Sequence, residues 1–348
     1  MKFLLLILCV LSTASAQLNV ASDLNDRGLE ASDAGRFDDA RKLFAEAIDK
    51  YKALGPAYDA HIAIVKMNLA QLYGGEGKRA ECAALLEESL AVFRRTVGFE
   101  NLNTLTTANV LASMYMMLGD PERAVKLLDE VLPIERKLYP NDVQLARTLG
   151  GLASLHMRQG RVEKAMAYAE EALAVSTKTE GEDSLEAALA YANLGEGHRV
   201  SGRPERALPL FRKARAIYSR RLGPDHPRVA SVLMQEGVLH LADAKLGLAE
   251  QSLTEALGIL DKSCPLCVFE RIAAKNDLAL LRIRQGKYDA ADQLLSDVLA
   301  MQEKSHALPG QEIAVTLKSL AVVRQKERRY EDAERLKQRA SLLARSYR

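Results

Sequence analysis

The stretch from residue 106 to residue 132 shows most clearly how apolar and polar positions are arranged in this chain. Gly119, Asp120 and Pro121 divide it into two arms, and Pro121 is placed to open a helix. Apolar and small residues recur at helical spacing, at Leu111, Ala112 and Tyr115 in the first arm and at Ala124, Leu128 and Val131 in the second. The pattern predicts two helices around one turn, a hairpin that cannot bury its apolar faces without neighbours.

The same columns return along the whole chain at spacings of 41 or 42 residues. The small residue of the first arm falls at Gly28, Ala70, Ala112, Ala153, Gly195, Gly237, Ala279 and Ala321. The turn column holds Gly35, Gly77, Gly119, Gly160, Gly202, Ala244, Gly286 and Arg328. Columns that stay in register over so many units predict a repeat solenoid, in which each hairpin packs on its neighbours.

The order of these columns resembles the tetratricopeptide repeat, whose basic form is about 34 residues long. The longer period, the first helices with Asn68-Leu69-Ala70 or Asn193-Leu194-Gly195, and the junction Leu222–Pro227 are similar to the kinesin-light-chain-type subfamily. The resemblance covers nearly all of residues 20–348. It implies an all-α, right-handed superhelical solenoid of about eight helix-turn-helix repeats. It is specific for the fold only, because such solenoids serve many unrelated partners.

Composition agrees with an ordered helical chain, since 27% of residues are charged, 48% are hydrophobic and none is Trp. A formal net charge of +2 argues against binding nucleic acid over the whole surface. No low-complexity linker interrupts the array, so residues 17–348 are expected to form a single solenoid domain.

Residues 1–16 differ from the rest of the chain. Lys2 precedes the apolar run Phe3–Leu11, and Ala14-Ser15-Ala16 follows. This order is typical of a secretory signal peptide and predicts cleavage before Gln17. The alternative is a membrane anchor, although the run is shorter than the ~20 residues that span a bilayer. We therefore expect an exported protein, periplasmic or extracellular, without stable membrane insertion after cleavage. The lack of an Asn-x-Ser/Thr acceptor weakly favours a bacterial envelope.

Three cysteines remain after cleavage. Cys82 occupies a small-residue column, which predicts a buried thiol. Cys264 and Cys267 lie together in a junction between repeats, and in an exported chain a disulfide is the default. A redox pair is an alternative, because a helix N-terminus lowers a thiol pKa, but the βαβ context of thioredoxin-like motifs is absent. An unpaired or metal-binding pair is a third possibility.

No other pattern indicates catalysis or a cofactor. His156, His198 and His240 recur one repeat apart in the aromatic column, and helices spaced about 8–10 Å apart cannot bring all three to one ion. These histidines are expected to fill packing positions. Because neither a Gly-rich phosphate loop nor a nucleophile motif occurs, no cofactor, no metal and no enzymatic activity are expected.

The resemblance implies that the first helix of each hairpin lines a concave groove that contacts a ligand. The groove candidates are Asn68, Asn109, Arg147, Arg158, Asn193, Arg199, Asn276 and Arg284. Asparagine amides suit the backbone of an extended peptide, and arginines suit its carboxylates. Alternatively, some of these asparagines tie neighbouring helices and some arginines pair with local acids.

These patterns favour a non-enzymatic scaffold that binds a protein or peptide, as an extended or acidic segment in the groove. Two other functions stay open. One is a structural subunit of an envelope or secretion assembly. The other is a thiol–disulfide oxidoreductase that uses Cys264 and Cys267.

Overall fold

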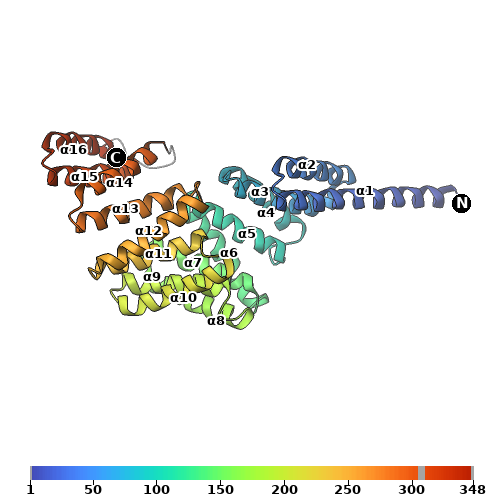
Figure 1. Cartoon of the computed structure of the whole chain (residues 1–348). Coiled ribbons are helices and arrows are strands. Elements are labelled where there is room, and N and C mark those ends of the chain that lie inside the picture. The colour runs from blue at the N-terminus through green and yellow to red at the C-terminus, as the bar shows by residue number, and fades with distance from the viewer. Residues whose placement is uncertain (1, 305–309, 346–348) are drawn as a thin grey trace. The chain divides into compact units, whose positions relative to one another are not determined.

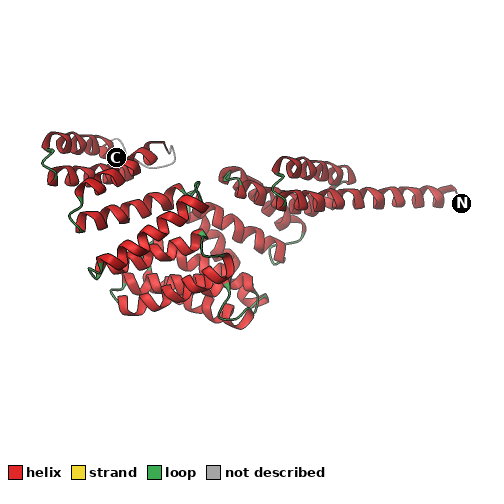
Figure 2. Ribbon diagram, in the orientation of Figure 1, coloured by secondary structure: helices red, strands yellow, loops and turns green. Residues whose placement is uncertain are grey.

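The computed structural model describes residues 2–304 and 310–345. Within these residues the chain forms sixteen α-helices and one 3-10 helix. No strand occurs among the described residues (Figure 2). The helices of the first half are α1 (Lys2–Asp33), α2 (Phe37–Leu54), η1 (Pro56–Tyr58), α3 (Asp59–Gly75), α4 (Arg79–Thr96), α5 (Leu102–Met117), α6 (Pro121–Leu138), α7 (Val143–Arg158) and α8 (Val162–Thr179). Those of the second half are α9 (Leu185–Val200), α10 (Pro204–Leu222), α11 (Pro227–Ala242), α12 (Leu246–Ser263), α13 (Val268–Arg284), α14 (Tyr288–Lys304), α15 (Gly310–Lys326) and α16 (Tyr330–Arg345).

Each odd-numbered helix packs against the even-numbered helix that follows it, and each hairpin packs against the next within its unit (Figure 1). The predicted all-α repeat solenoid is therefore confirmed. The chain divides into two compact units, Met1–Thr179 with α1–α8 and Glu180–Arg348 with α9–α16.

The turn column has one backbone conformation in every hairpin. Its six glycines have φ between 70° and 80°, as at Gly202 and Gly119. Ala244 and Arg328 adopt the same left-handed region, with φ of 56° and 65°. This region costs an L-residue roughly 1–2 kcal/mol, so hairpin packing, rather than glycine, imposes the turn.

Close helix packing within a hairpin depends on the small column and on the residue sixteen positions later. A Cβ on Gly195 of α9 would lie 2.7 Å from Cε1 of Phe211 on α10, and one on Gly28 would lie 2.6 Å from Cε1 of Phe44. Both Phe rings are fully buried. Where the small residue is Ala70, Ala112 or Ala279, the residue sixteen positions later is instead Leu86, Leu128 or Leu295. Glycine thus makes room for a Phe ring at Gly28 and Gly195, and at Gly237 it makes room for Leu253, whose Cγ would lie 2.6 Å from an added Cβ.

At the N-terminus, helix α1 includes residues 2–16, which the sequence pattern assigns to a signal peptide. Helix α1 is continuous from Lys2 because neither Gly nor Pro occurs before Gly28 to end it. Among the side chains that are described, the first buried one is Ala21. No helix in the described part of the chain is both long and apolar enough to cross a bilayer. At the other end, α16 runs from Tyr330 to Arg345 within the described residues.

Candidate functional site

The first helices of the first unit carry a partly exposed apolar surface rich in methionine. On each first helix, the position three residues before the small column and the positions one, four and five residues after it lie on one face. Met67 of α3, Met116 and Met117 of α5 and Met157 of α7 occupy such positions. Met117 is 54% exposed. Flexible thioether side chains adapt to different apolar partners, so this face is suited to contact with another chain.

Three of these first helices, α3, α5 and α7, are almost free of acidic residues. Helices α5 and α7 contain neither Asp nor Glu. The only acid of α3 is Asp59, whose Oδ2 forms an ion pair with Nη2 of Arg95 at 2.8 Å. Arg147 and Arg158 are exposed on α7, and Nη1 of Arg147 donates to Oε1 of Gln144 at 3.2 Å. In the described part of the chain Arg158 has no ion-pair partner. The first unit therefore offers basic side chains beside an apolar surface.

The other two candidate arginines belong to the second unit. Nε and Nη2 of Arg199 donate to the two carboxylate oxygens of Glu196, at 2.7 and 2.6 Å. This bidentate pair neutralises Arg199, as expected under the alternative that some of the arginines pair with local acids. Arg284 is exposed at the end of α13 and has no ion-pair partner among the described residues.

The four candidate asparagines fall in two columns rather than one. Asn68 and Asn193 lie two positions before the small residue, whereas Asn109 and Asn276 lie three before it. Nδ2 of Asn68 donates to Oδ1 of Asn25 at 2.9 Å, and Asn193 is buried. Asn276 is half-buried and makes no side-chain hydrogen bond within the described residues. Only some of the asparagines are therefore available to a ligand.

Asn109 belongs to a polar network that sequence reasoning missed. Its Nδ2 donates to Oε1 of Glu135 on α6 at 2.9 Å, and its Oδ1 accepts from Oγ1 of Thr148 on α7 at 2.8 Å. Glu135 is 0% exposed, and burial raises the pKa of its carboxyl, against the opposing effect of the hydrogen bonds from Thr148 and Asn109. Asn109 thus connects three helices, α5, α6 and α7.

Asp277 is a second group that the sequence did not single out. It lies half-buried on α13, next to Asn276. Burial raises the pKa of Asp277 to about 6, although the positive charge of Arg199 acts in the opposite direction. In the sequence, Asp277 is marked only by its position two residues before the small column, the position that Asn68 and Asn193 also occupy.

Two of the three recurring histidines are buried packing residues. His156 is fully buried and its ring stacks on Tyr168 with a centroid distance of 5.5 Å. His240 is also buried, and burial lowers the pKa of both imidazoles. No group of three or more metal-ligating side chains occurs among the residues that the structure describes.

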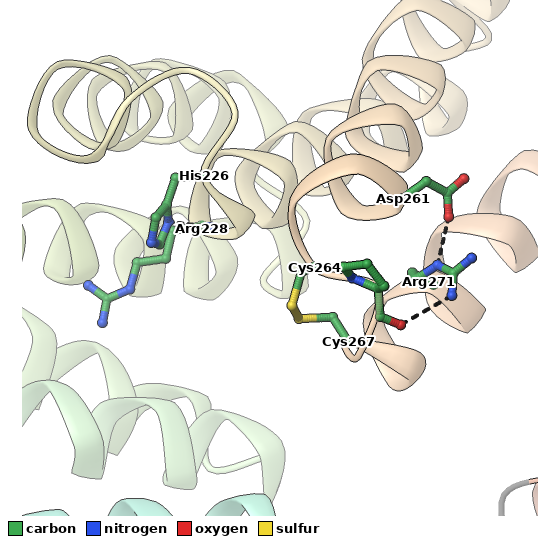
Figure 3. Close-up of a disulfide and its surroundings, with 7 residues drawn as sticks. His226, Arg228, Asp261, Cys264, Cys267 and Arg271 are labelled. Atoms are coloured by element: carbon green, nitrogen blue, oxygen red, sulfur yellow. Dashed lines mark hydrogen bonds and ion pairs between the residues drawn. A yellow bond between two sulfur atoms is a disulfide. The ribbon is translucent and has the colours of Figure 1, made fainter. Parts of the chain in front are cut away.

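The structure joins Cys264 and Cys267 in a disulfide whose Cα atoms are 5.3 Å apart (Figure 3). Cys264 directly follows α12 and Cys267 directly precedes α13. The disulfide therefore closes the junction between two repeats. Cys82 is a buried free thiol, and burial raises its pKa, which makes it unreactive.

Comparison with known proteins places the repeats in a family. A family model described as tetratricopeptide repeat matches residues 61–137, 144–220 and 193–262, and a second with the same description matches residues 25–88. A search of curated proteins gives no significant match.

Several solved structures share the fold. The apo form of RapI has a TM-score of 0.65 at 14% identity, over 82% of this chain and 99% of that chain. A tetratricopeptide repeat protein from Parabacteroides merdae ATCC 43184 has a TM-score of 0.57 at 18% identity, over 88% and 99% of the two chains. A putative kinesin light chain with nearly identical TPR-like repeats from Podosopora anserina has a TM-score of 0.50 at 21% identity, over 59% and 97%. Together with the repeats described above, the family match shows that this chain belongs to the tetratricopeptide repeat family.

Proposed function

We propose that this chain is a non-enzymatic scaffold that binds an extended, acidic segment of a partner protein on helices α3, α5 and α7 of its first unit. The observation that carries the proposal is the charge of α3, α5 and α7. These three helices contain a single acid, Asp59, which is already paired with Arg95, while Arg158 is exposed without an ion-pair partner among the described residues. An acidic segment meets no repulsion there.

The apolar part of the same surface supports a peptide rather than a free anion as the ligand. Met116, Met117 and Met157 adapt to aliphatic side chains, and exposed Val110 of α5 extends the apolar area. Half-buried Asn68 of α3 adds an amide to these first helices, although it already bonds to Asn25. A peptide that alternates apolar and acidic side chains would match both features.

Charge reversal of Arg158 tests this function. Arg158→Glu should weaken binding of a short labelled peptide that alternates Leu and Glu by about fivefold or more, because an attraction becomes a repulsion. Fluorescence anisotropy at low and high salt measures the effect, and the wild-type affinity should fall as salt rises.

The control is Lys137→Glu, which makes the same charge change at an exposed position of the second helix α6. Both variants should keep the wild-type melting temperature, since exposed charges contribute little to stability. Equal affinities of the two variants for the acidic peptide would exclude Arg158 from the binding site.

We also propose that the protein is exported and that residues 1–16 are removed. The order Lys2, Phe3–Leu11 and Ala14-Ser15-Ala16 supports cleavage. Among the side chains that the structure describes, the buried core begins at Ala21, after the expected cleavage site. The disulfide is consistent with an oxidising compartment.

We therefore expect the exported protein to begin at Gln17, and a chain that starts there to melt at the temperature of the full chain. N-terminal sequencing of protein from a secreting host checks the first point. Recovery of the intact N-terminus in the membrane fraction would replace export by anchoring.

A further inference from the structure

A small hollow opens between the N-terminal halves of α11 and α13 in the second unit, with a volume of about 260 Å³. Its apolar lining comes from Pro227, Met234, Leu260, Phe269 and Ala273. Leu260 is 1% exposed and Phe269 is 42% exposed, so the hollow has a buried base and a wall open to solvent. Its volume lies below the ~300–1,000 Å³ of small-molecule sites, which suits one large side chain.

The disulfide holds the wall of this hollow. Cys264 follows α12, which carries Leu260, and Cys267 precedes α13, which carries Phe269 two residues later (Figure 3). The covalent bond therefore fixes the start of α13 against the end of α12. Because Leu260 and Phe269 lie on these two ends, their separation depends on that bond.

A second connection crosses the same junction. Nε of Arg271 donates to Oδ1 of Asp261 at 2.6 Å, and its Nη1 donates to the carbonyl of Pro265 at 3.3 Å (Figure 3). Helix α11 starts differently, with the side chain of His226 as its N-cap, whereas Cys267 makes no side-chain cap. At α13 the disulfide and Arg271 therefore provide the restraint that a side-chain cap provides at α11.

The rim of the hollow carries one uncompensated negative charge. Glu270 lines the hollow, is exposed and has no ion-pair partner within the described residues. The nearest basic residues of α13 are already ion-paired, Arg271 as above and Lys275 with Asp297 at 2.6 Å. Arg228 of α11 points away from the disulfide (Figure 3). A cation next to the hollow would therefore be attracted.

We propose that this hollow binds one large apolar side chain of an extended peptide whose next residue is Lys or Arg, and that the Cys264–Cys267 disulfide maintains its shape. This inference rests on the proposed function in one respect, namely that the first helices of the repeats bind a peptide. The residues belong to the second unit, and the peptide has the opposite charge.

The test uses the full chain and three short labelled peptides of a Gly/Ser backbone, with Phe-Lys, Ala-Lys or Phe-Glu at the centre. The Phe-Lys peptide should bind about tenfold or more tightly than the Ala-Lys peptide, because burial of the Phe ring is lost in the latter. It should also bind more tightly than the Phe-Glu peptide. Equal affinities for the three peptides would overturn the proposal.

Variants locate the site and test the disulfide. Ala273→Trp fills the hollow and should abolish binding, whereas Val315→Trp, at the same exposed column of α15 outside the hollow, should bind as wild type. Glu270→Lys should invert the preference between the Phe-Lys and Phe-Glu peptides. Replacing both Cys264 and Cys267 by Ser should weaken binding several-fold, with helicity by circular dichroism as the control for folding.

Measurements on these variants can contradict the inference. If the two Trp variants bind alike, the hollow is not the site, and if the double Ser variant binds as wild type, the disulfide does not shape it. Arg158→Glu separates this proposal from the proposed function, because it should weaken the acidic peptide only. If Arg158→Glu also abolished binding of the Phe-Lys peptide, that peptide would bind to the first unit, and the proposed site at Glu270 would be overturned.

Discussion

Replacing Gly195 by Ala should destabilise the second unit by about 1–3 kcal/mol, the usual cost of overpacking a filled core. The added methyl group would lie 2.7 Å from Cε1 of Phe211, a side chain with no exposed surface. The direction of this stability change is informative, because replacing Gly by Ala within a helix normally stabilises a protein by roughly 0.5–1 kcal/mol. Urea denaturation followed by circular dichroism measures the shift in midpoint.

The matched control is Gly258→Ala in α12. A Cβ there meets no atom within 4 Å, and the position is exposed within the helix, so stabilisation by up to about 1 kcal/mol is expected. Phe211→Leu should remove the clash at Gly195, and the double variant should be no less stable than Phe211→Leu alone. If Gly195→Ala and Gly258→Ala shift the midpoint in the same direction, close packing against Phe211 does not require glycine.

Asn109→Ala should cost about 1–3 kcal/mol at pH 7.5, because the buried carboxylate of Glu135 loses a hydrogen-bond donor. This loss of unfolding free energy should become smaller as the pH falls. Burial already raises the folded-state pKa of Glu135, and removing a donor raises it further. A carboxyl with a raised pKa destabilises the fold above that pKa, and the penalty disappears once the group is protonated in both states, below about pH 4.5.

Asn276→Ala provides the comparison, since Asn276 stands in the same column and makes no side-chain hydrogen bond within the described residues. It should change the free energy of unfolding by less than about 0.5 kcal/mol at every pH. Combined with Glu135→Gln, Asn109→Ala should cost less than it does alone and lose its pH dependence. Equal effects of the two Asn variants would mean that Asn109 does not support Glu135.

The comparison of Asn109 with Asn276 shows where sequence reasoning about the site stops. Both lie three residues before the small column, so periodicity gives them the same helical phase and the same expected role. Asn109 meets Glu135 and Thr148, which are 26 and 39 positions away in the chain. Whether such a partner exists depends on individual residues of neighbouring helices, which the repeat pattern does not specify. The pair Arg199–Glu196 is different, because the two residues lie three positions apart on the same helix and the sequence already places them together.

By itself, the sequence determined the hairpin repeat and the position of every turn, because helical phase is a local property that recurs with each unit. Even Ala244 and Arg328, which break the glycine column, were assigned to turns by register alone, and both have a left-handed backbone. Only the tertiary structure decided which polar side chains are already occupied. It also revealed the hollow at Phe269, since a cavity depends on how side chains from α11, α12 and α13 fit together in space. Periodicity fixes which face a residue occupies, whereas side-chain packing between helices decides what it meets there.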